Sequence, residues 1–296
     1  MTDVPAHTIV VGTDGSATAD RAVVWAAEQA RAEGRDLTIV HAVPVVGTTS
    51  TFWMESAGID SAEARAAIAA EAEQLLAEAA RTALAVAPGV EIRGVVAEMD
   101  PRDALLDLAP DATMVVLGSR GRGPVASLLL GSVAHALSRD ARCPVVVVRP
   151  PQGDQERRGV LVGVGREGGG AALDFAYRQA SLRSLPLRVV HCIWDARASS
   201  GTVGPDEEGY DAERLLLAET VAGMSEAYPD VEVQTALERG MVDRTLVRLG
   251  EQAELVVVGV KRRNPIAGLV RGRTSAVVTE QSTGIVAVVP EPVAGD

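Results

Sequence analysis

The sequence predicts an α/β protein built from two tandem five-stranded parallel sheets, each covered by helices on both faces as an α/β/α sandwich. Three observations predict this class: a long internal repeat, apolar β-branched runs without polar alternation, and helical patterns between those runs. Strands that lack alternation are typical of sheets covered on both faces, and strands that alternate with helices indicate a parallel sheet. A chain of 296 residues is long enough for two such domains.

The repeat divides the chain into two copies. His7–Ala30 matches Gly159–Ala180, and a polar segment rich in proline and glycine lies before the second copy. We therefore predict a first domain over residues 1–150, a linker over 151–158 and a second domain over 159–296. The later matching pairs are Leu37–Val43 with Leu187–Ile193, Met114–Gly123 with Leu255–Asn264, and Cys143–Pro150 with Gly284–Glu291.

Each helix of the first copy is predicted from its own signal. An apolar stripe over residues 22–30 follows the pair Gly15-Ser16, which can cap a helix. Residues 61–87 form a long segment rich in alanine and glutamate. Over residues 100–108, an Asp-Pro pair places a capping carboxylate before a first-turn proline. Residues 132–139 lie in a fourth helix.

Composition and charge exclude several classes of function. The net charge of −12 leaves no basic face for counterion release, so we expect no nucleic-acid partner. No apolar run reaches the roughly 18 residues of a membrane span, so we expect no membrane partner. The N-terminus shows no signal-peptide pattern, and we expect a cytoplasmic protein. Cys143 and Cys192 lie in strand-like runs and are expected to be buried, reduced thiols.

The most informative segment is GSRGRGPVASLLLGS, Gly118–Ser132, directly after the strand-like run MVVL. Glycines can adopt positive φ and let backbone N–H groups approach an anion, and we expect Gly118, Gly121 and Gly123 to use this freedom. Gly131-Ser132 then begins a helix whose N-terminus favours phosphate.

A second loop, GTDGS, follows the first strand and places Asp14 at the same edge of the sheet. An anion-binding loop together with a carboxylate for ribose hydroxyls would suit a nucleoside triphosphate. The alternative is that the glycines only close a βα turn. The segment is neither a Walker P-loop nor a Rossmann fingerprint, because both require motifs that this chain lacks.

These motifs resemble the universal stress protein family. The resemblance rests on G-x2-G-x9-G-S after the fourth strand, V-G-x-D-G-S at the first and C-P-V-V-V-V at the fifth, and it covers almost the whole chain as a tandem of two domains. It implies the strand order 3-2-1-4-5 of adenine nucleotide alpha hydrolase-like folds. It also implies pairing through the fifth strand, Val145–Val148, either in a homodimer or within one chain as a pseudo-dimer.

The ATP-binding members of the family imply a nucleotide site in the first copy, with adenine near the second strand, ribose near Asp14 and phosphates on the strand-4 loop. We expect ATP to arrive with Mg²⁺. Carried onto this sequence, the ATP-binding residues are Gly12, Thr13, Asp14, Ala42, Gly118, Ser119, Arg120, Gly121, Arg122, Gly123, Gly131, Ser132 and Val133.

The second copy departs from these motifs. Gly165 stands where the first copy has Asp14, Arg262 replaces Gly121, and Arg273 replaces Ser132. We expect it not to bind ATP in the family's way. The alternative is a basic site for another anion, formed by Gly259, Lys261, Arg262, Arg263, Gly272, Arg273 and Thr274. The glycine-rich segment 166–172 is expected to be a flexible loop, with an anion nest as the alternative.

Three further features have a structural interpretation. His41 and His191 lie at equivalent places, so we expect a packing or hydrogen-bonding role for both. His135 is expected on the surface or in packing. Trp53 lies in the insert between the second strand and the long helix, where a flap over the nucleotide and a small satellite core are equally consistent with the sequence.

We therefore expect an ATP-binding regulatory module of the stress response, acting on a protein partner that the sequence does not name. The alternatives are a slow ATPase, a nucleotidyl transferase of the same α/β group, and a scaffold that binds no nucleotide. We expect no enzyme, because the sequence shows no general base beside the glycine loop and no paired carboxylates for metal ions, although slow incidental hydrolysis stays open.

Overall fold

The structure is a computed structural model that describes residues 5–43, 60–121, 130–150, 157–166, 170–195, 201–261 and 273–292. The chain separates into two compact units, Met1–Cys143 and Pro144–Asp296. Trp53 and the insert around it lie outside the described residues.

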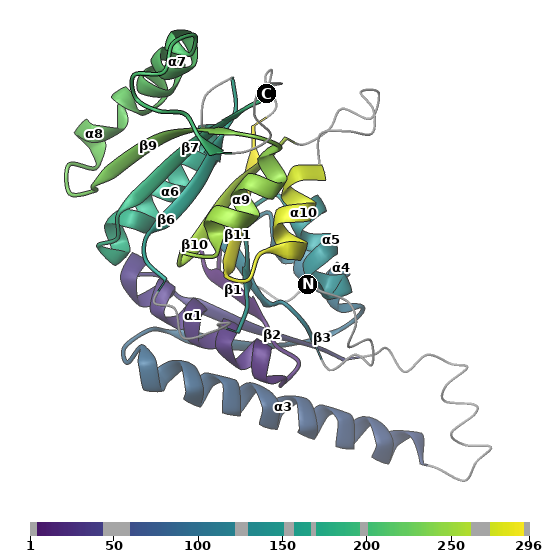
Figure 1. The fold of residues 1–296 in the computed structure, drawn as a ribbon. Coiled ribbons are helices and arrows are strands. Elements are labelled where there is room, and N and C mark those ends of the chain that lie inside the picture. The colour runs from purple at the N-terminus through teal and green to yellow at the C-terminus, as the bar shows by residue number, and fades with distance from the viewer. Residues whose placement is uncertain are drawn as a thin grey trace. The chain divides into compact units, whose positions relative to one another are not determined.

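The first unit is built on parallel strands (Figure 1). Its strands are β1 (Ile9–Gly12), β2 (Leu37–Val43), β3 (Ile92–Glu98) and β4 (Met114–Gly118). Of these, β1, β2 and β4 are mostly buried, whereas Val95 is the one buried residue of β3. β1 lies between β2 and β4, with Ile9 opposite both Leu37 and Met114. The strands of the first copy follow the order β3-β2-β1-β4-β5, which confirms the expected 3-2-1-4-5 arrangement.

The helices of the first unit begin where the sequence predicts. They are α1 (Ala17–Glu33), α3 (Ser61–Val86), α4 (Pro101–Leu108) and α5 (Ser132–Asp140). The side chain of Ser16 accepts a hydrogen bond from Ala19 N at 3.3 Å and caps α1. Asp100 caps α4 directly before Pro101. α1 and α3 pack against each other, and α4 packs against α5 (Figure 1).

The second unit repeats the same order of strands. Its strands are β5 (Val145–Val148), β6 (Val160–Val164), β7 (Leu187–Ile193), β9 (Val233–Arg239), β10 (Leu255–Lys261) and β11 (Ile285–Glu291). Within this unit β5 pairs antiparallel with β11, with Val146 opposite Ala287. The other pairs of these strands are parallel.

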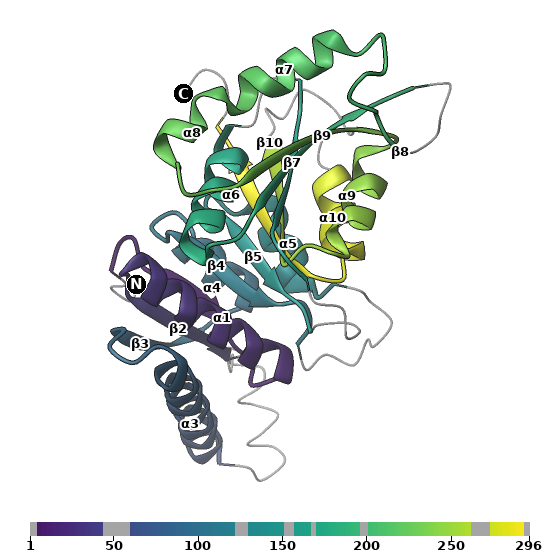
Figure 2. The same cartoon turned by 60° about the vertical axis from the view of Figure 1, so that its left-hand side comes forward.

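Helices cover both faces of the second unit's sheet (Figure 2). They are α6 (Gly170–Arg183), α7 (Asp211–Ala222), α8 (Met224–Ala227), α9 (Val242–Gly250) and α10 (Arg273–Gln281). α6 lies on one face, with α9 and α10 on the other (Figure 2).

One strand was not expected from the sequence. β8 (Gly201–Thr202) pairs antiparallel with the end of β9, so this unit's sheet has a short edge strand beyond the five predicted. Hydrogen bonds hold it: Arg239 donates to Thr202 O at 3.2 Å, and the Thr202 hydroxyl donates to Glu238 at 2.7 Å. These bonds join residues more than thirty positions apart, which a local sequence pattern does not reveal.

Both cysteines are free thiols, as expected, with Cys143 buried and Cys192 partly buried. Burial raises the pKa of Cys143 to about 12 and that of Cys192 to about 11. None of the described helices is long and apolar enough to cross a membrane.

Candidate functional site

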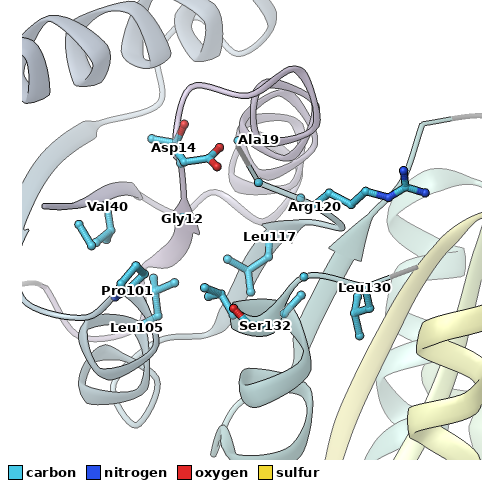
Figure 3. A pocket seen from close by; sticks show the side chains of 17 residues that line it. Gly12, Asp14, Ala19, Val40, Pro101, Leu105, Leu117, Arg120, Leu130 and Ser132 are labelled. Carbon is cyan, nitrogen blue, oxygen red and sulfur yellow. The ribbon is translucent and has the colours of Figure 1, made fainter. Parts of the chain in front are cut away.

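A cavity of about 690 Å³ opens in the first unit beside the carboxyl ends of β1, β2 and β4 (Figure 3). Its volume falls within the range of about 300–1,000 Å³ that small-molecule and cofactor sites occupy. This is the edge of a parallel sheet where ligands bind in doubly wound folds. Its lining residues are Gly12, Thr13, Asp14, Ala19, Val40, Ala42, Pro101, Leu105, Leu117, Gly118, Arg120, Gly121, Leu130, Gly131, Ser132, Val133 and Ala134.

The loop after β1 holds Asp14 in a defined place. Ser16 N donates to Asp14 Oδ1 at 3.0 Å, and Gly15 N donates to the Thr13 hydroxyl at 3.2 Å. Gly15 has φ 71°, a backbone conformation that glycine adopts at no steric cost. The loop therefore directs one carboxylate to the cavity wall from a short, hydrogen-bonded turn.

Close packing and not backbone conformation requires glycine at Gly118, the last residue of β4, and at Gly121, which corrects one of our expectations. Gly118 and Gly121 do not have positive φ. A Cβ added to Gly118 would lie 2.7 Å from the backbone carbon of Thr18 in α1. A Cβ added to Gly121 would overlap Asp14 Oδ2. Gly121 thus makes room for the carboxylate, and a larger residue at this position, such as the arginine of the second copy, would conflict with it sterically.

The N-terminus of α5 forms the opposite part of the wall. Gly131 is the N-cap residue of α5 and provides no side-chain hydrogen bond to the helix. The backbone N–H groups in the first turn of α5 therefore depend on other acceptors. Gly131 N donates to Ser119 O at 2.8 Å, which ties the helix start to the β4 loop. In the view of Figure 3, Asp14 lies above and Ser132 below the cavity. Backbone N–H groups, a helix dipole and the Ser132 hydroxyl favour an anion at this end.

An apolar lobe completes the cavity, and the sequence reasoning missed it. Its side chains are Val40, Pro101, Leu105 and Leu117, whereas Leu130 lies on the other side of Ser132 (Figure 3). Two of them come from α4, whose capped start the sequence did predict. The signal was available: a helix that starts at the carboxyl end of β3 lies at the same sheet edge as the other two loops. From the sequence we placed the loops after β1 and β4, and Ala42 of β2, at this edge, but not α4.

The start of α4 is electrostatically fixed. Asp100 accepts hydrogen bonds from Arg102 N and Arg102 Nε, both at 2.9 Å. The hydrogen bond from the Arg102 guanidinium lowers the pKa of Asp100 to about 2. The cap is therefore charged at neutral pH and complements the helix N-terminus that carries Pro101 into the cavity.

Most of the predicted nucleotide-site residues line this cavity. Ser119 does not, because its exposed fraction is only 2% and its carbonyl binds Gly131 N. Arg120 lines the wall, but its guanidinium extends away from Asp14 and Ser132 (Figure 3). Arg122 and Gly123 lie outside the described residues, so their role stays a prediction.

Histidines hold the first-strand loop in both copies, which confirms the hydrogen-bonding role that we predicted. His41 Nδ1 lies 2.8 Å from Thr13 O, and His191 Nδ1 lies 3.0 Å from Val164 O. A carbonyl only accepts, so the imidazole N–H is the donor in each case. His135 is exposed, in agreement with the surface position expected for it.

The second unit differs at the position of the carboxylate. A Cβ added to Gly165 would have no atom within 4 Å, so the missing Asp14 counterpart reflects the residue type and not a lack of space. Of the residues considered for a second anion site, Gly259 and Lys261 lie at the end of β10 and Thr274 lies in α10. Arg262, Arg263, Gly272 and the side chain of Arg273 lie outside the described residues.

A carboxylate of the chain already lies beside Gly259. Ala171 N and Ala172 N, in the first turn of α6, donate to Glu291 at 2.9 and 3.0 Å. A Cβ on Gly259 would lie 2.7 Å from Glu291 Oε1. An external anion at Gly259 would therefore meet a like charge, and the geometry there does not favour the second anion site. Residues 167–169 of the glycine-rich segment lie outside the described residues, and Gly170 begins α6.

Comparisons with known proteins agree over almost the whole chain. A sequence profile described as "Universal stress protein family" matches residues 5–149 and again residues 156–290. A universal stress protein of Mycolicibacterium smegmatis is 34% identical over 290 residues, covering 95% of this chain and 96% of the relative. One of Mycobacterium tuberculosis is 34% identical over 282 residues, covering 92% and 93%. The crystal structure of a universal stress protein from Archaeoglobus fulgidus has a TM-score of 0.67, 18% identity and 97% coverage of both chains, a likeness in fold.

Proposed function

The chain belongs to the universal stress protein family, and on that premise we propose that its first unit binds ATP and that the bound nucleotide regulates which partner the protein contacts. One observation carries the proposal: a carboxylate, a helix N-terminus without a side-chain cap, and an apolar lobe line the same cavity. Each suits one part of an adenine nucleotide.

The three parts of the wall divide the ligand between them. The lobe around Leu105 and Leu117 suits a flat, largely apolar base. Asp14, an ionised acceptor, suits the ribose hydroxyls, which donate. The backbone from Gly118 to Gly121 and the start of α5 suit phosphate, because oriented N–H groups favour negative charge.

Mg²⁺ would have to enter with the phosphates. Asp14 is the single carboxylate among the described lining residues, and one of its oxygens already accepts from Ser16 N. No group of three or more His, Cys, Asp and Glu side chains able to hold a metal ion occurs in the described part of the chain. These residues do not fit an ion held by protein ligands alone, so we derive no step through Mg²⁺.

We propose a binding module and not an enzyme. The described lining residues include no histidine, cysteine or lysine, and Asp14 is the one side chain among them that resembles a general base. Incubation of the protein with Mg-ATP should leave the nucleotide intact, as measured by phosphate release. Turnover above the rate of a heat-denatured control would instead support the slow-ATPase alternative.

Isothermal titration with Mg-ATP tests the binding itself. The wild-type chain should bind one ATP, and Asp14→Asn should weaken binding roughly tenfold or more, because a charged acceptor is lost. Gly165→Asp is the matched control: it adds a carboxylate where the second unit has room, yet it should create no second ATP site, because Arg262 and Arg273 replace the loop glycine and serine. No binding by the wild-type chain would overturn the proposal.

We also propose that fifth-strand pairing is satisfied within one chain. The antiparallel ladder between β5 and β11, with Val145 opposite Val288, supports the intramolecular alternative. Sedimentation equilibrium should then show a monomer at micromolar concentration. A stable dimer would favour the pairing of two chains.

A further inference from the structure

The His41 imidazole reaches the residue next to the proposed ribose carboxylate. The register between β1 and β2 runs to the pair Gly12 and Val40. One residue beyond it, Thr13 N donates to Val40 O at 2.9 Å. The Thr13 carbonyl then accepts from His41 Nδ1 at 2.8 Å. The side chain of a β2 residue thus fixes the last peptide group before Asp14.

This peptide group, together with the hydrogen bond from Ser16 N to Asp14 Oδ1, determines where Asp14 points. Thr13 has an exposed fraction of 6% and is held through its amide, its carbonyl and its hydroxyl, the last accepting from Gly15 N at 3.2 Å. On the other side, Gly15 has a φ of 71° and permits backbone rotation that other residues resist. Without the imidazole, rotation of the peptide between Thr13 and Asp14 would turn the carboxylate away from Gly121.

We propose that His41 is the positioning residue for Asp14, and that it thereby sets the preference of the site for a sugar with free hydroxyl groups. The inference rests on the proposed function, because it requires a nucleotide in the first unit. The second unit provides an internal comparison. His191 makes the same bond to Val164 O at 3.0 Å, but the next residue is Gly165, which has no carboxylate to position.

Titrations with two nucleotides separate positioning from general support of the fold. ATP has both ribose hydroxyls, whereas 2′,3′-dideoxy-ATP has neither. His41→Leu removes the donor, His41→Asn keeps an N–H donor close to the place of Nδ1, and His191→Leu removes the equivalent bond from the second unit.

The wild-type chain should bind ATP more tightly than the dideoxy nucleotide. His41→Leu should raise the Kd for ATP and leave the Kd for the dideoxy nucleotide nearly constant, so the ratio of the dideoxy Kd to the ATP Kd should fall by about tenfold. His41→Asn should keep most of the preference, and His191→Leu should keep all of it. Equal weakening of both nucleotides by His41→Leu would indicate a purely structural role and overturn the inference, as would an unchanged ratio.

Failure of the wild-type chain to bind ATP would overturn the proposed function and this inference together, whereas an unchanged ratio alone would leave the proposed function standing. A second measurement does not depend on a variant that folds. The ¹⁵N spectrum of the His41 imidazole should show a proton on Nδ1. A neutral ring protonated only on Nε2 would overturn the inference, because Nδ1 could then not donate to Thr13 O.

Discussion

Replacing Gly121 with alanine should weaken ATP binding without unfolding the protein. The added Cβ would overlap Asp14 Oδ2, so the carboxylate must turn away from its place at the cavity wall. Gly121 is exposed and its φ is not positive, so its backbone accepts alanine. A hydrogen bond to a charged group contributes about 1.5–3 kcal/mol, which predicts a rise in Kd of roughly 10- to 150-fold.

A double-mutant cycle tests whether the effect passes through Asp14. Titration calorimetry would compare the wild-type chain, Gly121→Ala, Asp14→Ala and the double variant, with thermal unfolding of each as the check on folding. Once Asp14 is alanine, the second substitution should change the Kd for ATP very little. If Gly121→Ala raised the Kd for ATP as much in the Asp14→Ala background as in the wild-type chain, the reasoning would be refuted, because alanine at position 121 would then act on the ligand directly.

Three further predictions concern stability and titration. Gly118→Ala should destabilise the chain by about 1–3 kcal/mol, which is more than Gly259→Ala should. The Cβ added at Gly118 meets backbone atoms of α1, whereas the Cβ added at Gly259 meets only side chains. Equal losses of unfolding free energy in urea denaturation would contradict this. Asp100, with a pKa lowered to about 2, should titrate near that value by NMR. The stability that the Asp100 carboxylate contributes is present above its unfolded pKa of 3.8 and is lost as pH falls towards 2. A titration midpoint of Asp100 near 3.8 would contradict the hydrogen bond from Arg102. Cys192, with a pKa raised to about 11 by burial, should alkylate slowly at pH 8, and stability should fall as pH rises above its unfolded pKa of 9.0, since the folded state then retains the proton. Alkylation as fast as that of a free thiol would contradict the burial.

Local signals in the sequence predicted the elements of the first unit well. Ser16 before α1 and the Asp100-Pro101 pair before α4 act through bonds to residues two or three positions away, so their patterns are visible in a short window. The fold class followed from the repeat and from the buried strands. The loops that carry Asp14 and Gly121 were also predicted to meet, because the carboxyl ends of parallel strands share one edge.

Contacts between distant residues were the part that the sequence could not provide. The overlap between Gly121 and Asp14 involves residues more than a hundred positions apart, so we first explained the glycine by backbone conformation. The contact of Glu291 with the start of α6 joins residues 120 positions apart. The apolar lobe was missed for a different reason: leucines in a helix or strand indicate a core, and nothing local distinguishes a core face from a cavity wall.

The nucleotide content of the purified protein tests the central claim most directly. The chain would be denatured, and the released nucleotides would be separated by ion exchange against ATP, ADP and AMP standards, before and after saturation with Mg-ATP and removal of the excess. The account predicts about one ATP per chain in the wild type after saturation, and a loss of it in Gly121→Arg, which introduces the residue of the second copy. No nucleotide in the wild type after saturation would contradict the account, as would two per chain with one retained in the variant.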